Sequence, residues 1–210
     1  MEEKVSAIIE ILKARYPDPV CALHYTKDYE LMIAVRLSAQ CTDARVNMIT
    51  PALFAAYPTL EAMAAAPIEH VEELVHSCGF YKHKARDIVF ACQTLLEKHN
   101  GKVPNSMEQL LSLPGVGRKT ANLLLGDLYG VPGSIVCDTH CIRICGRLGL
   151  SQGTDPEKVE RQLRPILPPE ESSDFCHRIV LFGRDICTAR NPQCSKCPLR
   201  FLCNTFHPEI

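Results

Sequence analysis

Lys119 and Asp138 are the two residues of this sequence whose types and spacing best suit covalent chemistry. A lysine in the first turn of a helix meets the positive end of the helix dipole, which favours the uncharged, nucleophilic amine. A carboxylate stabilises developing positive charge and transfers protons. Spacing alone leaves two structural roles open as well: Lys119 as a solvated surface residue, and Asp138 as the N-cap of a helix that runs to about residue 148.

A glycine-containing turn, residues 113–117 (LPGVG), precedes this lysine and predicts how it is held. A proline and two glycines require a tight turn whose backbone amides approach a ligand closely. Apolar spacing predicts a helix over 118–128, and Ser106-x-x-Gln109 is a capping box for a helix before the turn. Because amides at a helix N-terminus bind anions, the arrangement predicts a clamp for a nucleic-acid backbone. A P-loop is excluded, because that motif needs Gly directly before the lysine and this chain has Arg118.

Four of the twelve cysteines form a second candidate site: Cys187, Cys194, Cys197 and Cys203, separated by six, two and five residues. No export signal is visible, so reduced thiols that hold a metal are expected rather than disulfides. Zinc and an iron-sulfur cluster both remain open, with iron favoured because zinc sites commonly use two close pairs and only one is present here. The other eight are expected to pack as small apolar residues: Cys21, Cys41, Cys78, Cys92, Cys137, Cys141, Cys145 and Cys176.

The composition indicates a folded intracellular protein. Its 210 residues are 46% hydrophobic with a net charge of -1, and no stretch approaches the roughly 20 apolar residues of a membrane span. The first helix has acidic residues at its start, unlike a targeting segment, so we expect a cytoplasmic location and no membrane. Near-zero net charge excludes indiscriminate nucleic-acid binding, so DNA contact requires an uneven charge distribution, and residues 175–204 are basic while 61–76 are acidic.

Helical periodicity predicts an all-α fold, since no segment alternates with the two-residue period of a sheet. Arg36 lies in an apolar segment and is expected to snorkel to solvent. Helices are expected over residues 1–16, 29–40, 43–56, 67–79, 81–98, 118–128, 138–148, 155–165 and 175–185, the last capped by Asp174.

The segments LPGVGRKTANLLL and VCDTHCIRICGRLGL, together with the cysteine spacing, resemble the endonuclease III family of DNA glycosylases. Weaker similarity covers residues 37–47 and 79–88. The resemblance implies a helix-hairpin-helix DNA glycosylase fold with a cleft between two domains. One is a 4Fe-4S cluster domain, residues 1–20 and 133–210; the other is a six-helix domain, residues 21–132, with the helix-hairpin-helix at about 106–128.

The resemblance also implies the chemistry, that of a bifunctional DNA glycosylase and abasic-site lyase of base excision repair. Lys119 is implied as the nucleophile that forms a Schiff base, with Asp138 assisting, and the strand is then cleaved by β-elimination. The implied cofactor is a 4Fe-4S cluster held by Cys187, Cys194, Cys197 and Cys203. The implied substrate is duplex DNA with an oxidised pyrimidine or an abasic site, bound by a monomer that associates with the nucleoid when on DNA.

The target base must leave the helix, so the resemblance further implies residues that fill the gap and grip the backbone. Gap filling is assigned to Gln40 and to the tip Cys78-Gly79-Phe80, although Gln40 as a helix-end surface residue and Phe80 as a core aromatic remain open. The full set of implied DNA-binding residues is Gln40, Cys78, Phe80, Leu113, Gly115, Gly117, Arg118, Thr139, His140 and Arg190.

Three alternative functions are weighed against this one. A monofunctional adenine or mismatch glycosylase shares the hairpin and the aspartate but lacks the nucleophilic lysine, and an adenine glycosylase would carry an acidic residue near 31–40, where this chain has none. A non-catalytic iron-sulfur DNA-binding protein would use the same clamp without forming a Schiff base.

Overall fold

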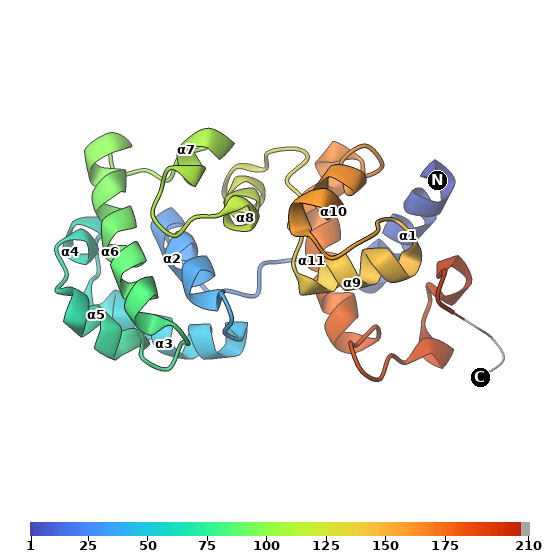
Figure 1. Ribbon diagram of the computed structural model, residues 1–210, viewed down its shortest axis with the longest axis horizontal. Helices are drawn as coiled ribbons and strands as arrows, with labels where there is room; N and C mark the ends of the chain where they lie inside the picture. Colours follow the sequence, from blue (N-terminus) through green and yellow to red (C-terminus); the bar gives the residue numbers. More distant parts are fainter. Residues whose placement is uncertain (207–210) are drawn as a thin grey trace. The chain divides into compact units, whose positions relative to one another are not determined.

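The computed structural model describes residues 1–206, and every regular element in that range is helical, which confirms the predicted all-α class (Figure 1). None of the helices in this range could span a membrane. The α-helices are α1 Glu2–Arg15, α2 Asp28–Ser38, α3 Asp43–Ala56, α4 Leu60–Ala64, α5 Ile68–Val75, α6 Tyr81–Lys98, α7 Met107–Leu111, α8 Arg118–Tyr129, α9 Thr139–Leu148, α10 Pro156–Leu163 and α11 Ser172–Asp185. Short 3-10 helices are η1 Pro169–Glu171, η2 Cys194–Lys196 and η3 Arg200–Leu202.

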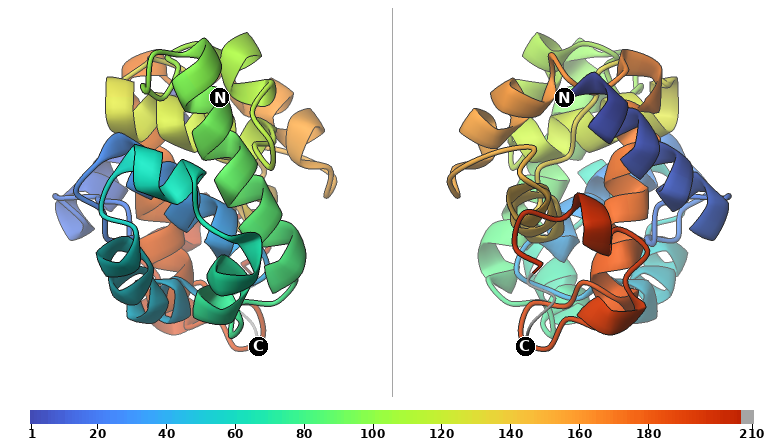
Figure 2. Two further views of the ribbon diagram at one scale, coloured as in Figure 1. Left: turned by 90° about the vertical axis from the view of Figure 1, so that its left-hand side faces the viewer. Right: turned by 90° about the vertical axis from the view of Figure 1, so that its right-hand side faces the viewer.

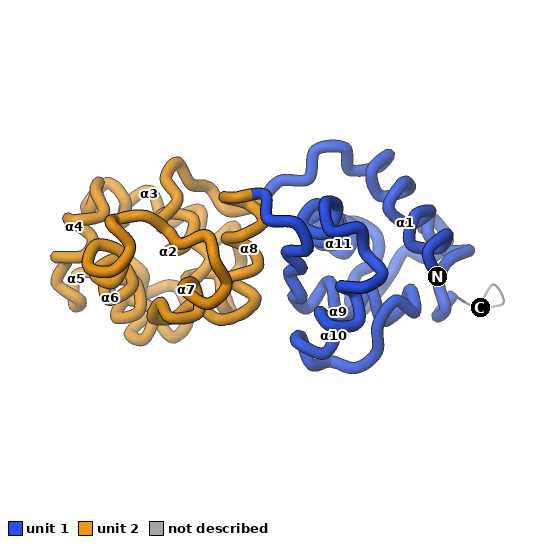
Figure 3. Tube along the Cα trace, turned by 90° about the horizontal axis from the view of Figure 1, so that it is seen from above, with its two compact units in different colours: residues 1–20, 130–210 blue, residues 21–129 orange. Residues whose placement is uncertain are grey.

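The chain forms two compact units (Figure 3). Unit 1 consists of Met1–Val20 and Gly130–Ile210, and unit 2 of Cys21–Tyr129. Unit 2 therefore contains helices α2 to α8, and unit 1 joins α1 to the helices α9 to α11 and the cysteine-rich segment.

Unit 2 is built around α2 and α6. Helix α2 carries an uninterrupted apolar run, and residues 31–35 are buried on every side, as expected for a helix at the centre of a core. The 18-residue helix α6 packs against α4, α5 and α2, and α2 also contacts α3 and α8. The hairpin formed by α7 and α8 therefore rests on the central helix of the unit.

Side-chain caps fix several of the helix starts. Thr42, Thr59, Ser106 and Asp155 each accept a hydrogen bond from a backbone amide in the first turn of the helix that follows. The predicted cap at Asp174 is wrong. Because η1 runs directly into α11, that helix already begins at Ser172.

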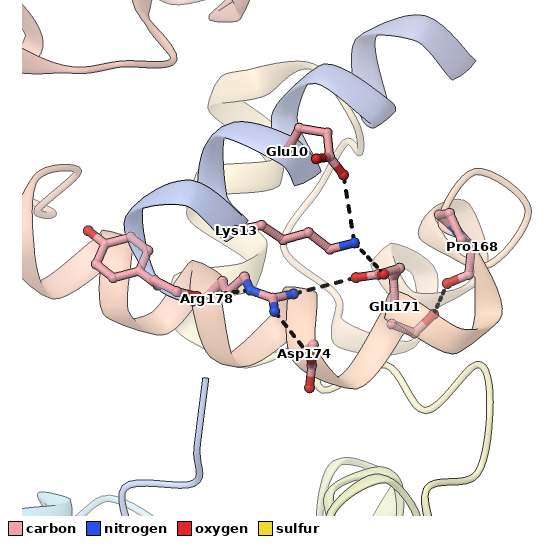
Figure 4. Close-up of polar contacts among 8 residues, drawn as sticks. Glu10, Lys13, Pro168, Glu171, Asp174 and Arg178 are labelled. Carbon is pink, nitrogen blue, oxygen red and sulfur yellow. Dashed lines mark hydrogen bonds and ion pairs between the residues drawn. The ribbon is translucent and has the colours of Figure 1, made fainter. Parts of the chain in front are cut away.

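In unit 1, charged contacts link α1, η1 and α11, and α1 and α11 lie side by side (Figure 2). Lys13 Nζ lies 2.5 Å from Glu171 Oε1, and Arg178 donates to Glu171 and Asp174 at 3.4 and 3.2 Å (Figure 4). The Arg178 side chain is only 6% exposed. The Arg178 charge is therefore used in packing around α11. Arg178 does not contribute to the basic surface that the sequence predicts for residues 175–204.

Candidate functional site

The hairpin turn between α7 and α8 is anchored by buried side chains and leaves its glycines exposed. Leu113 and Val116 are 3% and 8% exposed, and the Val116 amide donates to the Leu113 carbonyl at 3.2 Å. Gly115 has φ +74, a conformation that side chains disfavour. Gly115 and Gly117 are both exposed directly before α8. The turn thus combines a rigid base with accessible backbone at a helix N-terminus, the arrangement that binds phosphate.

Arg36 of α2 packs against this turn, a contact that no sequence motif indicates. Arg36, which is expected to snorkel to solvent, is 22% exposed, and its guanidinium pairs with Asp87 of α6 at 2.5 Å. A Cβ atom placed on Gly115 would lie 2.7 Å from Arg36 Nε and 2.8 Å from Asp87 Cβ. The hairpin therefore contacts α2 and α6 so closely that only glycine fits.

Lys119 is the second residue of α8, and its side chain is exposed. The residues that follow it, 121–125, are all buried and fix the helix in unit 2. Arg118, beside it, is half-buried. The structure therefore presents the amine of Lys119 to solvent at the same helix terminus as the glycine turn.

Asp138 is the N-cap of α9 in unit 1, as its position before Thr139 and His140 predicts. Its Oδ1 accepts from the Cys141 amide at 2.8 Å, and its Oδ2 lies 3.0 Å from His140 Nδ1. The side chain is 18% exposed, so these two contacts fix a carboxylate that solvent still reaches. Thr139 is exposed next to it.

His140 is in turn held by close packing between α9 and α11. A Cβ atom on Gly183 of α11 would lie 2.7 Å from His140 Cδ2 and 2.9 Å from Arg143 Nη2. The two helices approach this closely because residue 183 has no side chain. The orientation of His140, and through it of Asp138, therefore depends on Gly183.

The two predicted gap-filling loops meet within unit 2. Gln40 and Phe80 both have left-handed backbone, with φ +54 and +59, and both are exposed, Phe80 to 64%. Exposure removes the alternative of Phe80 as a core aromatic. Lys84 of α6 is 1% exposed and donates from Nζ to the carbonyls of Leu37 and Ala39 at 2.9 and 2.7 Å, which fixes the segment before Gln40 to α6. The Cys78 side chain is fully buried at the base of the tip.

The four cysteines of the C-terminal segment line one cavity of about 250 Å³. Burial, together with the nearby thiols of the other three, raises the pKa of Cys197. No group of three or more Cys, His, Asp or Glu among the described residues is close enough to hold a single metal ion. Four thiols around a cavity, rather than around a point, fit a polynuclear cluster better than a lone zinc ion.

Arg147, in the last turn of α9, also lines this cavity, although no sequence motif indicates it. Its Nη1 donates to Cys187 Sγ at 3.2 Å and to the Thr188 carbonyl at 2.9 Å. Its own carbonyl accepts from the Asn204 amide at 3.0 Å. Arg147 thus bridges the two ends of the cysteine segment. Arg190, in the loop between the first two cysteines, is exposed.

The remaining cysteines are mostly buried, as predicted. Cys78, Cys92, Cys137, Cys141, Cys145 and Cys176 are buried, whereas Cys21 and Cys41 are partly exposed. Cys141 contacts Cys137, Cys145 and Cys176, and these contacts, with burial, raise its pKa well above the usual value.

Two family models match the chain. Residues 33–169 match the HhH-GPD superfamily of base excision DNA repair proteins. Residues 187–203, from the first to the last of the four cysteines, match the iron-sulfur binding domain of endonuclease III. Together with the hairpin and the cysteine cavity, these matches define the class: a base excision DNA repair protein with an iron-sulfur centre.

Comparison with individual proteins shows which family within this class the chain resembles. Endonuclease III of Synechocystis sp. is 44% identical over 202 residues, which cover 96% of this chain and 92% of the relative. Endonuclease III of Escherichia coli is 41% identical over 93% of this chain and 92% of its own length. A solved structure of a trapped endonuclease III–DNA covalent intermediate superposes with a TM-score of 0.91 at 43% identity, covering 97% of this chain and 96% of that one.

The chain belongs to the endonuclease III family. The predicted function class is thereby confirmed: it is a bifunctional base excision repair enzyme, a DNA glycosylase with abasic-site lyase activity. Its partner is DNA, and its cofactor is a 4Fe-4S cluster.

Proposed function

We propose that Lys119 is the nucleophile of this enzyme and acts on oxidised pyrimidines in duplex DNA. The observation that carries the proposal is the exposed amine in the first turn of α8, directly after the glycine turn. The free amine attacks the anomeric carbon of the deoxyribose, and the damaged base leaves with the bonding electrons. The sugar ring then opens to give a Schiff base, which acidifies the neighbouring sugar carbon; loss of a proton from that carbon expels the 3′ phosphate, and this β-elimination cleaves the strand.

We assign the assisting role to Asp138. Its carboxylate stabilises the positive charge that develops on the sugar as the base departs, and it accepts and returns protons. The hydrogen bond from the Cys141 amide favours the ionised form, so the capping role and the catalytic role are compatible. His140, 3.0 Å from the carboxylate, fixes its orientation and is proposed, with the exposed Thr139, to contact a phosphate.

Backbone amides of the protein bind the DNA phosphates, and side chains fill the gap that the extruded nucleotide leaves. The exposed amides of the turn at Gly115 and Gly117, with Arg118, bind phosphates on one side of the lesion. Leu113 serves this contact as a buried anchor. Gln40 and Phe80 fill the space that the extruded nucleotide leaves. Because Cys78 is buried, we assign it no direct contact with DNA.

Cys187, Cys194, Cys197 and Cys203 are the proposed ligands of the 4Fe-4S cluster, since all four line the same cavity. The cluster supplies a rigid cross-link among thiolates in a segment whose only regular structure is two 3-10 turns. Arg147 holds the first ligand, and Arg190 provides a positive charge for the DNA backbone beside it. The four cysteines and Arg147 thus shape a tail that has little core of its own.

Borohydride trapping on abasic-site duplex DNA tests the nucleophile. Reduction of the Schiff base should leave a covalent protein–DNA complex with the wild type and none with Lys119→Gln. Lys98→Gln, which removes an exposed lysine from the last turn of α6, is the matched control and should trap normally. Trapping by Lys119→Gln would assign the amine to another residue. Release of adenine alone from an A:G mismatch would favour a monofunctional adenine glycosylase.

We also propose that the protein acts as a monomer in the cytoplasm, associated with the nucleoid when on DNA and without membrane contact. Support comes from the presence of the whole proposed residue set in one chain of 23.4 kDa. Light scattering during size-exclusion chromatography should give that mass, and a twofold larger mass would contradict the proposal.

A further inference from the structure

Two cysteine thiols lie in contact at the base of the proposed gap-filling loops. Cys41 Sγ is 3.5 Å from Cys78 Sγ. Cys41 follows α2 and Cys78 follows α5, so the contact joins two loops that are 37 residues apart in sequence. Both belong to unit 2. A disulfide needs sulfurs about 2.0 Å apart, so a movement of roughly 1.5 Å closes the bond.

The two thiols differ in accessibility. Cys41 is partly exposed and Cys78 is fully buried. Burial raises the pKa of Cys78 to about 11, while the positive charges of Lys84 and Arg45 act in the opposite direction. An oxidant from solvent therefore meets Cys41 first, and Cys78 is placed to react second.

We propose that Cys41 and Cys78 form a redox-modifiable dithiol that a small disulfide such as oxidised glutathione converts to an internal disulfide. The Cys41 thiolate attacks one sulfur of the oxidant, which releases one glutathione thiol and leaves a mixed disulfide. Cys78 then loses its proton and attacks the Cys41 sulfur, which releases the second glutathione. Two electrons pass from the two cysteines to the oxidant, and a thiol reductant reverses the reaction.

The disulfide restricts the movement of the loops that carry Gln40 and Phe80. Its effect on DNA binding rests on the function proposed above. The two loops are already adjacent, since a Cβ atom on Gly79 would lie 4.0 Å from the Gln40 carbonyl. Each loop also holds a non-glycine residue in left-handed backbone, so each has little conformational freedom to spare. Drawing the sulfurs together shifts both loops, and we expect the oxidised protein to bind lesion DNA more weakly.

Peptide mapping tests the dithiol without reference to DNA. Trypsin releases Cys41 in residues 37–45 and Cys78 in residues 46–82, and neither peptide contains another cysteine. After treatment of the cluster-loaded protein with oxidised glutathione, a non-reducing digest should contain the two peptides joined, and reductant should separate them. Persistence of a glutathione adduct on 37–45, or two unmodified peptides, would overturn the proposal.

DNA binding tests the consequence. Oxidised wild type should bind abasic-site duplex several-fold more weakly and recover after reduction, with the visible absorbance of the cluster unchanged throughout. Cys41→Ser is the matched control: it should bind as the reduced wild type does and ignore the oxidant. Joined peptides with unaltered binding would overturn the loop-locking consequence. Joined peptides in a protein whose reduced form neither binds nor traps DNA would instead overturn the proposed function and leave the dithiol standing.

Discussion

The guanidinium of Arg36 lies 2.5 Å from the carboxylate of Asp87, and this ion pair fills the space beside the hairpin glycine Gly115. Three elements distant in sequence meet there: α2, α6 and the turn before α8. The pair is partly buried, with side chains 22% and 27% exposed. The position of the hairpin is therefore set by side chains that take no part in the proposed chemistry.

Replacing Gly115 by alanine should displace the hairpin. The new Cβ would meet Arg36 Nε at 2.7 Å, and φ +74 is unfavourable for alanine. We expect a loss of about 1–3 kcal/mol in unfolding free energy, measured by denaturant titration, and weaker DNA binding. Gly117→Ala is the matched control, because nothing lies within 4 Å of its Cβ position; its stability should stay within about 0.5 kcal/mol of wild type. Equal stability of the two variants would contradict the close packing.

Lys84→Met should loosen the loop after α2. The substitution keeps the length of a buried side chain but leaves the carbonyls of Leu37 and Ala39 without their donor, at a cost of about 1–3 kcal/mol each if no water replaces it. Hydrogen exchange at residues 39–42 should become faster. Lys82→Met, from the exposed side of the same helical turn, should leave exchange unchanged. Unaltered exchange in Lys84→Met would show that the loops are held by other contacts.

Two substitutions at Asp138 separate its capping role from its charge. Asp138→Asn retains an oxygen that accepts from the Cys141 amide, so the unfolding free energy should change little, whereas Asp138→Ala should lose about 1 kcal/mol. Base release should fall by about 100-fold or more in both variants, because both lack the carboxylate. Full activity of Asp138→Asn would restrict this residue to capping.

Arg147→Ala should weaken the hold on the cluster. The change removes hydrogen bonds to Cys187 Sγ and to the carbonyls of Thr188 and Ala189, together worth at least about 1.5–3 kcal/mol. The visible absorbance of the cluster should disappear about tenfold faster in denaturant. Arg161→Ala, an exposed arginine on α10, should lose absorbance at the wild-type rate. Identical rates in all three proteins would mean that the cysteines alone retain the cluster.

Local chemistry made much of the fold predictable from the sequence. Thr42, Thr59 and Ser106 cap helices because their hydroxyls reach amides only three residues away. The spacing of the four C-terminal cysteines is also a local feature, and all four line the same cavity. Asp174 was misassigned because η1, an extra turn of 3-10 helix, extends α11 toward its N-terminus.

Contacts between residues far apart in the chain could not be predicted from the sequence. Arg36 and Asp87 are 51 residues apart, and Arg147 and Cys187 are 40 apart, and neither pair forms a recognisable motif. The sequence left Phe80 between a core and a surface role, which only its exposure of 64% decides. The roles of Lys119 and Asp138 come from the family resemblance, since residue type and spacing alone favour a surface lysine and a helix cap.

Unit 1 is assembled from two stretches of chain, while unit 2 is a single continuous stretch. A ribosome therefore delivers all of residues 21–129 before any of α11, and domains that emerge whole fold first. During that interval the apolar stripe of α1, formed by Val5, Ile8, Ile9 and Leu12, has no α11 to cover it. The nascent chain therefore carries an uncovered amphipathic helix until α11 has been synthesised and can pack against it.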